Sequence, residues 1–217
     1  MKKKIALICT AVVLVAAIAV GGTLALLTDS TDKVQNTFTV GKGISIDLKE
    51  PAWDGVDFGG NTSTASEDLG ENLAQNFVPS RVIPKDPTVK NISETDEVWI
   101  AVKLDVGYQL NEDGTTYKVT GKDALDKIQD FAQIDWNAGW EAKDADGNSL
   151  VYYYKTKVAA GAETANLFSE VAINNDANEQ GMDNFKIDVT AYAVQAENVE
   201  YEAAKTALDN LMTQVGA

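Results

Sequence analysis

The segment EVWIAVKLDVGY, residues 97–108, is the strongest strand signal in the chain. Its residues alternate with the period of a β-strand, and the periodicity of a helix is absent. Lys103 and Asp105 belong to one face, and the opposite face is apolar throughout, formed by Val98, Ile100, Val102, Leu104 and Val106. A strand with one apolar face is typical of an antiparallel sheet that covers a core. The segment therefore predicts a long, half-buried antiparallel strand.

Other segments extend this pattern to the whole chain. Residues 185–194 give a second clean alternation, and shorter strand signals occur at 34–40, 43–49, 117–120, 134–142, 150–158 and 166–173. Gly-Lys-Gly at 41–43 predicts a turn between the first two short strands, and Asp-Ala-Asp-Gly at 144–147 predicts a hairpin between 134–142 and 150–158.

Two segments have helical spacing instead. A short helix is expected at about 123–133, with Ala124, Leu125, Ile128 and Phe131 on one face. The chain ends in an amphipathic helix whose apolar stripe is Tyr201, Ala204, Leu208 and Leu211. Residues 51–79 are rich in Gly, Ser, Thr, Asn and acids, which predicts a long surface insertion with at most a helical turn or two near 66–76, where Ser66 could cap.

These elements predict an all-β fold, an antiparallel two-sheet sandwich of jelly-roll type with one or two short helices and a C-terminal helix. An immunoglobulin-like sandwich is the nearest alternative. It is disfavoured by the chain length and by the absence of the cysteine pair with its tryptophan spacing. Nothing in the composition indicates a second domain, so residues 26–217 are expected to form a single one.

The first residues have the anatomy of a secretory signal peptide, assigned to 1–25. Residues 2–4 are all lysine, and residues 5–20 form an apolar run. This run is shorter than the roughly 20 residues needed to span a bilayer core. Small residues follow it, so we expect cleavage between Ala25 and Leu26. The alternative is that the segment stays uncleaved as an anchor.

Charge and composition exclude several kinds of function. Three of the 18 basic residues and none of the 33 acidic ones lie in the signal, so the mature chain has a net charge of −18 and should repel nucleic acid and anionic membranes. The only cysteine, Cys9, leaves with the signal, and the chain has no histidine. Disulfides, Cys/His zinc sites, cysteine nucleophiles and imidazole-containing triads are therefore excluded in the mature chain.

Two groups of residues could bind a ligand. Asp144, Asp146 and Asn148 place oxygen-bearing side chains on alternate residues of a tight turn, where they could converge on calcium. The run is shorter than an EF-hand loop and lacks its bidentate glutamate, so a plain hairpin turn is favoured; no cofactor is expected, with calcium left open. Trp136, Trp140 and the tyrosines at 152–154 could line a sugar-binding face, but core packing explains them better.

Several segments together resemble the camelysin and TasA-like family of secreted Gram-positive surface and biofilm-matrix proteins. They occur in order along most of the chain: GGTLALLTD at 21–29, NTFTVG at 36–41, IDL at 46–48 leading to EPAW at 50–53, PKDPTVKN at 84–91 before WIAV at 99–102, and AYAVQ at 191–195. Each motif alone is weak, and their order and spacing carry the resemblance.

The resemblance implies processing by a dedicated signal peptidase, a jelly-roll fold and, for the matrix members, fibres assembled by donor-strand exchange. In that mode the N-terminal segment of one subunit pairs with the sheet of the next. Residues 26–40 would be the donated segment, with Val34, Phe38 and Val40 as candidates for its apolar positions. The alternative is that these residues form a strand within their own chain.

Camelysin is described as a zinc-dependent protease, and this chain lacks the histidines which that activity requires. We therefore expect a secreted, non-enzymatic structural protein, a subunit of an extracellular surface or biofilm-matrix fibre, whose partners are further copies of itself and, during export, the signal peptidase. No stable membrane insertion is expected after cleavage. The alternatives are a monomeric cell-surface binding protein that uses the tryptophans and tyrosines or the 51–79 insertion, and a camelysin-type surface metalloprotease.

Overall fold

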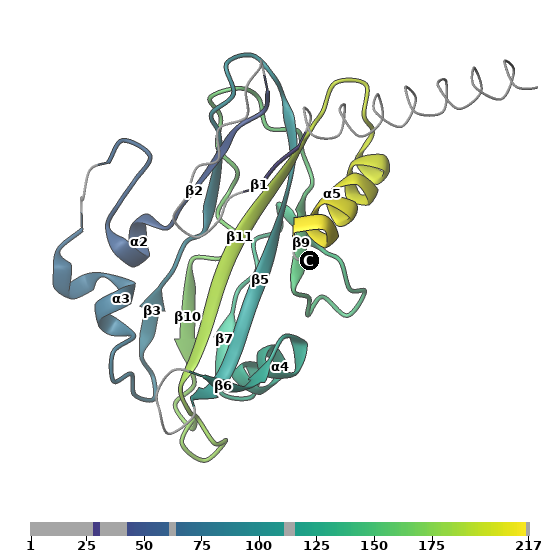
Figure 1. Cartoon of the computed structure of the whole chain (residues 1–217). Coiled ribbons are helices and arrows are strands. Elements are labelled where there is room, and N and C mark those ends of the chain that lie inside the picture. The colour runs from purple at the N-terminus through teal and green to yellow at the C-terminus, as the bar shows by residue number, and fades with distance from the viewer. Residues whose placement is uncertain (1–27, 31–42, 61–63, 111–115, 216–217) are drawn as a thin grey trace, which may run out of the picture.

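The computed structural model describes residues 28–30, 43–60, 64–110 and 116–215 (Figure 1). These residues form eleven strands in three sheets, and every strand pairing is antiparallel. A few short helices and one C-terminal helix complete the structure. The expectation of an all-β, antiparallel fold with a C-terminal helix is confirmed.

Two long strands form the centre of the molecule and lie side by side in Figure 1: β5 (Val98–Leu110) and β11 (Phe185–Gln195). They pair along the whole of β11, from Phe185 opposite Tyr108 to Gln195 opposite Val98. The apolar face predicted for residues 97–108 is buried as expected, with each of its five side chains at most 2% exposed. Burying one such side chain stabilises a fold by about 1.5–3 kcal/mol, so this pair anchors the core.

The largest sheet has six strands, in the order β1, β11, β5, β9 and β8, with β6 beside β5. The shorter members are β1 (Thr28–Ser30), β6 (Tyr117–Thr120), β8 (Trp140–Ala142) and β9 (Val151–Tyr154). Strands β8 and β9 pair with each other, which confirms the hairpin predicted around residues 144–147.

Two smaller sheets complete the β-structure. One contains β3 (Val82–Pro84), β10 (Glu170–Ile173) and β7 (Ala132–Ile134), and the other pairs β2 (Ile46–Lys49) with β4 (Thr88–Asn91). Their buried side chains, among them Ile46, Ile83, Val89 and Val171, belong to the same core cluster as the inner faces of β5 and β11. The predicted hairpin partner of β2, residues 34–40, lies outside the described residues.

The single strand predicted for residues 134–142 is wrong, because the chain divides there between two sheets. β7 pairs with β10, and β8 pairs with β9. Between them the Asn137 side chain accepts a hydrogen bond from the Gly139 amide at 2.8 Å. This local bond stabilises a turn that competes with the extended conformation.

Two longer helices cover the sheets. α4 (Lys122–Phe131) buries Ala124, Leu125, Ile128 and Phe131, as its spacing predicted. α5 (Tyr201–Val215) buries Ala204, Leu208, Leu211 and Met212. No helix among the described residues is both long and apolar enough to cross a membrane.

The 51–79 insertion contains three short helical elements among its described residues: α2 (Pro51–Asp54), η1 (Ser66–Asp68) and α3 (Gly70–Leu73). The predicted Ser66 cap is wrong, since Ala65 and Leu69 precede the two later elements and neither element has a side-chain cap. Asn72 Nδ2 donates instead to the Ser66 carbonyl at 2.6 Å.

A cluster of side chains fastens this insertion to the body. The buried Lys85 ammonium lies 2.5 Å from a Glu50 carboxylate oxygen and 4.7 Å from the centre of the Trp53 ring. Asp86 Oδ1 accepts the Ala52 amide at 2.8 Å. Burial raises the pKa of the Asp86 carboxyl, and the nearby Glu50 charge adds to this effect. The EPAW and PKDPTVKN segments, which are far apart in sequence, therefore contact each other.

Gly70 provides a test of how tightly the insertion is docked. A Cβ added there would lie 1.9 Å from the Pro84 carbonyl oxygen and 2.8 Å from a Trp53 ring carbon. Because the nearest atom is backbone, Gly70→Ala should force the insertion away from β3 and destabilise the protein by about 1–3 kcal/mol. Denaturant unfolding measures this loss. Glu71→Ala, at the exposed neighbouring position, is the control, and equal stability of the two variants would contradict tight docking.

Candidate functional site

One edge of the large sheet, as the described residues form it, lies along β11 and carries β1. Hydrogen bonds from Ala196 N to Glu97 O at 2.9 Å and from Gln109 N to Asn184 O at 2.6 Å show that even-numbered positions bond towards β5. Backbone groups alternate in direction along an antiparallel strand. The amide and carbonyl groups of the odd-numbered positions therefore point to the other side, the sheet edge. These positions are Phe185, Ile187, Val189, Ala191, Ala193 and Gln195.

The N-terminal strand β1 occupies one end of this edge. Its three residues pair antiparallel with β11, with Thr28 opposite Val194, Asp29 opposite Ala193 and Ser30 opposite Tyr192. From Phe185 to Val189, no strand formed by the described residues pairs with β11 on the edge that β1 occupies. The edge-facing backbone groups of Phe185, Ile187 and Val189 thus lie beyond the reach of β1. Strand β2 packs near β11, but its pairing is with β4.

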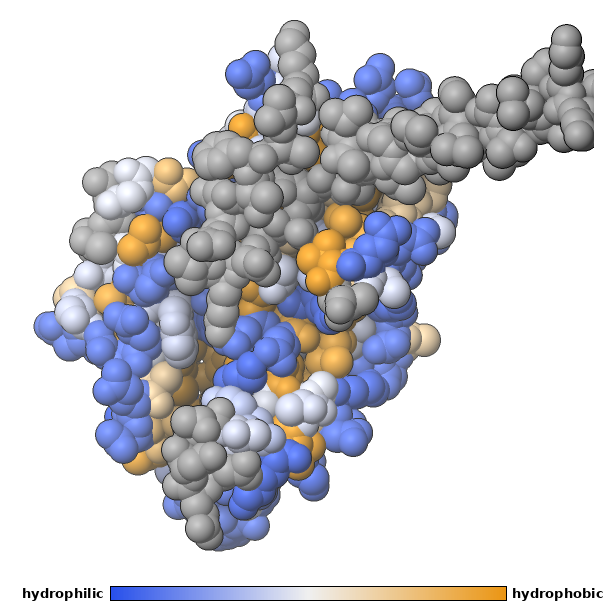
Figure 2. Space-filling model, viewed as in Figure 1, coloured by the Kyte–Doolittle hydropathy of each residue, from blue (hydrophilic) through white to orange (hydrophobic). Residues whose placement is uncertain are grey.

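α5 lies beside the sheet in Figure 1. It covers the outer face of the sheet at the end of β11 that pairs with β1. A second apolar cluster forms there, separate from the main core. Its sheet residues are Trp99, Ala101, Tyr153, Tyr192, Val194 and Ala196, and its helix residues are Ala204, Leu208, Leu211 and Met212. Tyr192 and Val194 are each 5% exposed. Viewed from the same side, the molecular surface is largely hydrophilic, with hydrophobic patches between the polar residues (Figure 2).

Polar contacts fasten α5 to the same face of the sheet further from β11, at β9 and β8. Glu141 of β8 accepts hydrogen bonds from Lys205 Nζ at 2.7 Å and from the Tyr201 hydroxyl at 3.1 Å. Asp209 accepts the Tyr153 hydroxyl at 2.6 Å and lies 2.8 Å from Lys143 Nζ. Burial raises the pKa of the Tyr153 and Tyr201 hydroxyls, and the neighbouring carboxylates raise it further. Both hydroxyls therefore act as hydrogen-bond donors at neutral pH.

The Glu141 contact should make the attachment of α5 depend on pH. The hydrogen bond from Lys205, assisted by Tyr201, holds the pKa of the Glu141 carboxyl below its usual range. Its stabilising effect is therefore present above the usual glutamate pKa, about 4.3, and is lost as the pH falls through the lower folded-state value. Glu141→Gln should lower the melting temperature at pH 7, and the difference from the parent chain should shrink as the pH falls below the usual glutamate pKa. Melting curves across this range test it, with the exposed Glu67→Gln as control. A pH-independent difference would contradict the assignment.

The residues predicted for processing and strand donation lie largely outside the described part of the chain. This holds for Ala25, Leu26, Val34, Phe38 and Val40. Of residues 26–40, only Thr28–Ser30 are described, and they form β1.

The calcium candidates form a hairpin turn, closed by a hydrogen bond from Gly147 N to Asp144 O at 3.0 Å. The Lys122 ammonium lies 3.1 Å from Asp146 Oδ2 and also donates to the Asn148 carbonyl. Through this contact Lys122 lowers the pKa of the Asp146 carboxyl. A lysine side chain thus already provides a positive charge at this turn. Among the described residues there is no group of three or more acidic side chains that could hold a metal ion.

The aromatic residues considered for sugar binding pack in or against the apolar clusters, with Trp136 and Tyr154 partly buried and the others buried. Trp136 stacks on Tyr152 with ring centres 4.5 Å apart, and Trp140 contacts Tyr154 at 4.9 Å. Tyr152 and Tyr153 are 2% and 1% exposed. Trp136 and Trp140 do not share a strand, because residues 135–139 connect β7 to β8. Core packing, the interpretation favoured by the sequence, accounts for these rings.

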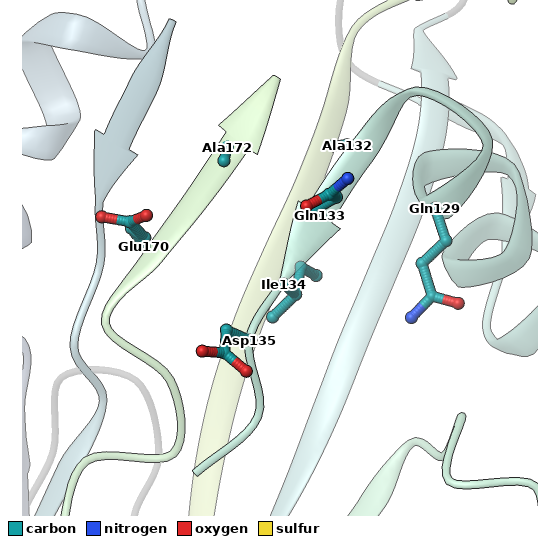
Figure 3. A pocket seen from close by; sticks show the side chains of 7 residues that line it. All are labelled: Gln129, Ala132, Gln133, Ile134, Asp135, Glu170 and Ala172. Atoms are coloured by element: carbon teal, nitrogen blue, oxygen red, sulfur yellow. The ribbon is translucent and has the colours of Figure 1, made fainter. Parts of the chain in front are cut away.

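A depression of about 530 Å³ lies beside β7 and β10 (Figure 3). It is lined by Gln129, Ala132, Gln133, Ile134, Asp135, Glu170 and Ala172. Two carboxylates and two amides line it, without a basic side chain or a nucleophile such as serine. These side chains can donate and accept hydrogen bonds, and none of them was a candidate in the sequence.

No family model, curated protein or solved structure matches this chain. A function is therefore inferred from two features of the structure: the pairing of β1 with the edge of β11, and the packing of α5 against the same end of the sheet. The sequence analysis did not predict that α5 packs on the outer face of the large sheet. The signal was the presence of apolar residues on the outer faces of β5 and β11, namely Trp99, Ala101, Tyr192 and Val194.

Proposed function

We propose that this protein is a non-enzymatic extracellular structural subunit that assembles into a surface or biofilm-matrix fibre by strand addition at the β11 edge. One observation carries the proposal: β11 has eleven residues, and β1 pairs with only three of them. Among the described residues no strand pairs with Phe185, Ile187 or Val189 on this edge, and such an edge strand is a template for a strand from another chain. Residues 26–40 are more than long enough to cover β11 from end to end.

Strand addition suits this edge because main-chain hydrogen bonds supply the affinity and alternate side chains supply the specificity. The edge-facing positions Phe185, Ile187 and Val189 direct their side chains towards the core, while their backbone groups point outwards. An added strand would extend the existing antiparallel sheet. We propose further that the three sheets together form a sandwich of jelly-roll type.

Export supports an extracellular role. The signal at 1–25 would place the chain outside the membrane, and its removal would free the segment that begins at Leu26. The mature chain needs no disulfide and has no cysteine to form one. The resemblance to camelysin and TasA-like proteins points in the same direction, and the missing histidines count against the protease alternative.

Electron microscopy and sedimentation of the processed, secreted chain test the proposal. Mass spectrometry should find its N-terminus within two residues of Leu26. Fibres should form faster as the pH falls towards the reference carboxyl pKa values of about 4 and as salt is added, because both changes weaken repulsion between subunits with a net charge of −18. A chain that stays monomeric at high concentration, acidic pH and high salt would exclude the fibre proposal and favour a monomeric surface protein.

A further inference from the structure

One end of β11 is held from two sides by elements from the two ends of the chain. β1 pairs with the backbone of Tyr192, Ala193 and Val194. The side chains of Tyr192 and Val194 are buried in the cluster that α5 covers. The same three-residue stretch therefore supports both the N-terminal strand and the C-terminal helix.

The turn that connects β11 to α5 is also fixed to the sheet. Trp99 Nε1 donates to the Val199 carbonyl at 2.9 Å, and the Trp99 ring packs against Tyr201 with ring centres 5.3 Å apart. The Lys157 ammonium donates to the Ala196 carbonyl at 3.1 Å. Because these contacts fix this end of β11, its edge-facing backbone groups stay oriented for hydrogen bonds to β1.

α5 extends this support across the sheet. Its buried residues contact the outer faces of β11, β5 and β9, and its polar contacts reach Glu141 of β8 and Tyr153 of β9. The helix thus joins four neighbouring strands of the large sheet. β1 contributes only three residues of pairing at the sheet edge, so local opening can detach it without breaking the β5–β11 ladder.

We propose that α5 is an autoinhibitory clamp on β1: while the helix is seated, it keeps the end of β11 rigid and retains the N-terminal strand on its own subunit. Loosening α5 releases β1 and exposes the β11 edge. The consequence for fibre growth rests on the proposed function, whereas the coupling between α5 and β1 is a property of the single subunit.

Hydrogen exchange of the dilute, monomeric processed chain tests the coupling. Leu208→Ala removes a buried side chain of α5 that is 1% exposed. It should accelerate amide exchange on the order of tenfold or more in α5, and also at the Asp29 and Ala193 amides, the pair that joins β1 to β11 in this register. The matched control is Leu125→Ala, which removes a fully buried leucine from α4 on the main core. It should accelerate exchange in α4 and leave β1 unchanged.

A second variant removes the negative charges from the polar contacts of α5 without making a cavity. Glu141→Gln combined with Asp209→Asn should loosen α5 and β1 together. Glu67→Gln combined with Glu179→Gln, two exposed positions, changes the net charge equally and should have no effect on exchange.

Exchange that rises in α5 while β1 keeps its parental rate would overturn the clamp, and so would a β1 released equally by Leu125→Ala. Unchanged exchange in α5 in both test variants would also contradict it, because the helix would not be held by these contacts. Fibre growth is then followed separately. If neither the parent chain nor any variant forms fibres, the proposed function fails, and the exchange rates still decide the clamp.

Discussion

Deleting residues 26–36 from the processed chain should give a folded, soluble monomer that cannot extend a fibre. The deletion removes β1, whose three residues lie at the edge of the large sheet, and keeps every described residue of the β5–β11 pair and of the main core. Loss of a central strand would instead leave buried backbone groups unpaired at about 1–3 kcal/mol each. That loss would be a large part of a total stability of roughly 5–15 kcal/mol.

Thermal unfolding of the truncated chain, beside sedimentation and electron microscopy of the intact one, measures both outcomes. Adding truncated subunits to growing intact fibres is the sharper comparison, because a truncated subunit can still accept a strand and cannot donate one. Growth should therefore stop. A truncation that forms fibres by itself would refute donation by this segment, and one that unfolds would identify it as an integral strand.

Ile187→Pro should abolish strand addition while the subunit remains folded. The Ile187 amide points to the sheet edge, so proline at this position removes no hydrogen bond from the β5–β11 ladder. Proline is tolerated in edge strands where the missing amide faces outwards. It would nevertheless remove a donor that an incoming strand requires, and its ring would obstruct the approach of that strand.

Ile187→Ala is the matched control. Ile187 is 7% exposed and packs in the core, so both variants lose its side chain, at a cost of about 2–5 kcal/mol. Only the proline variant also blocks the edge. Electron microscopy at temperatures where both variants are folded should find fibres of the alanine chain and none of the proline chain. Equal assembly by both would show that subunits do not join along this part of β11.

The central strands and both longer helices could be predicted from the sequence because their side chains repeat regularly. Residues 97–108 and 185–194 alternate without interruption, and both became strands with the expected face buried. Four apolar residues at helical spacing placed α4 within two residues of its actual ends. Such patterns are local and long enough to specify an element.

Pairings between distant segments could not be predicted in the same way. β2 pairs with β4, which lies more than 30 residues later in the chain. The sequence of neither short strand indicates which strand it pairs with. The division of residues 134–142 involves hydrogen bonds of Asn137 to Gly139 and, across the chain, to Leu167. β1 consists of Thr, Asp and Ser, and Asp and Ser have little preference for strands, so its place on β11 follows from tertiary structure alone.

The candidate site shows the same limit. The sequence identified residues 26–40 as a candidate for strand donation. The sheet order was needed to show that their described part, β1, pairs with the edge of β11. The calcium and sugar-binding candidates were compatible with the sequence, whereas a lysine contact and core packing occupy these side chains in the structure. Pairing at the β11 edge is therefore the feature that most needs a direct measurement.

Cysteine cross-linking provides that measurement, since the processed chain contains no other thiol. Thr28 lies opposite Val194, and by the alternation along β11 this is a non-hydrogen-bonded pair, with Cα atoms about 4.5 Å apart, within disulfide range. Chains carrying only Thr28→Cys are mixed with chains carrying only Val194→Cys, assembled and oxidised. Strand exchange predicts cross-linked dimers of the two different chains in fibres and none in dilute monomer. Fibres without such dimers, in which the Thr28→Cys/Val194→Cys double variant closes its disulfide only within one chain, would contradict the account.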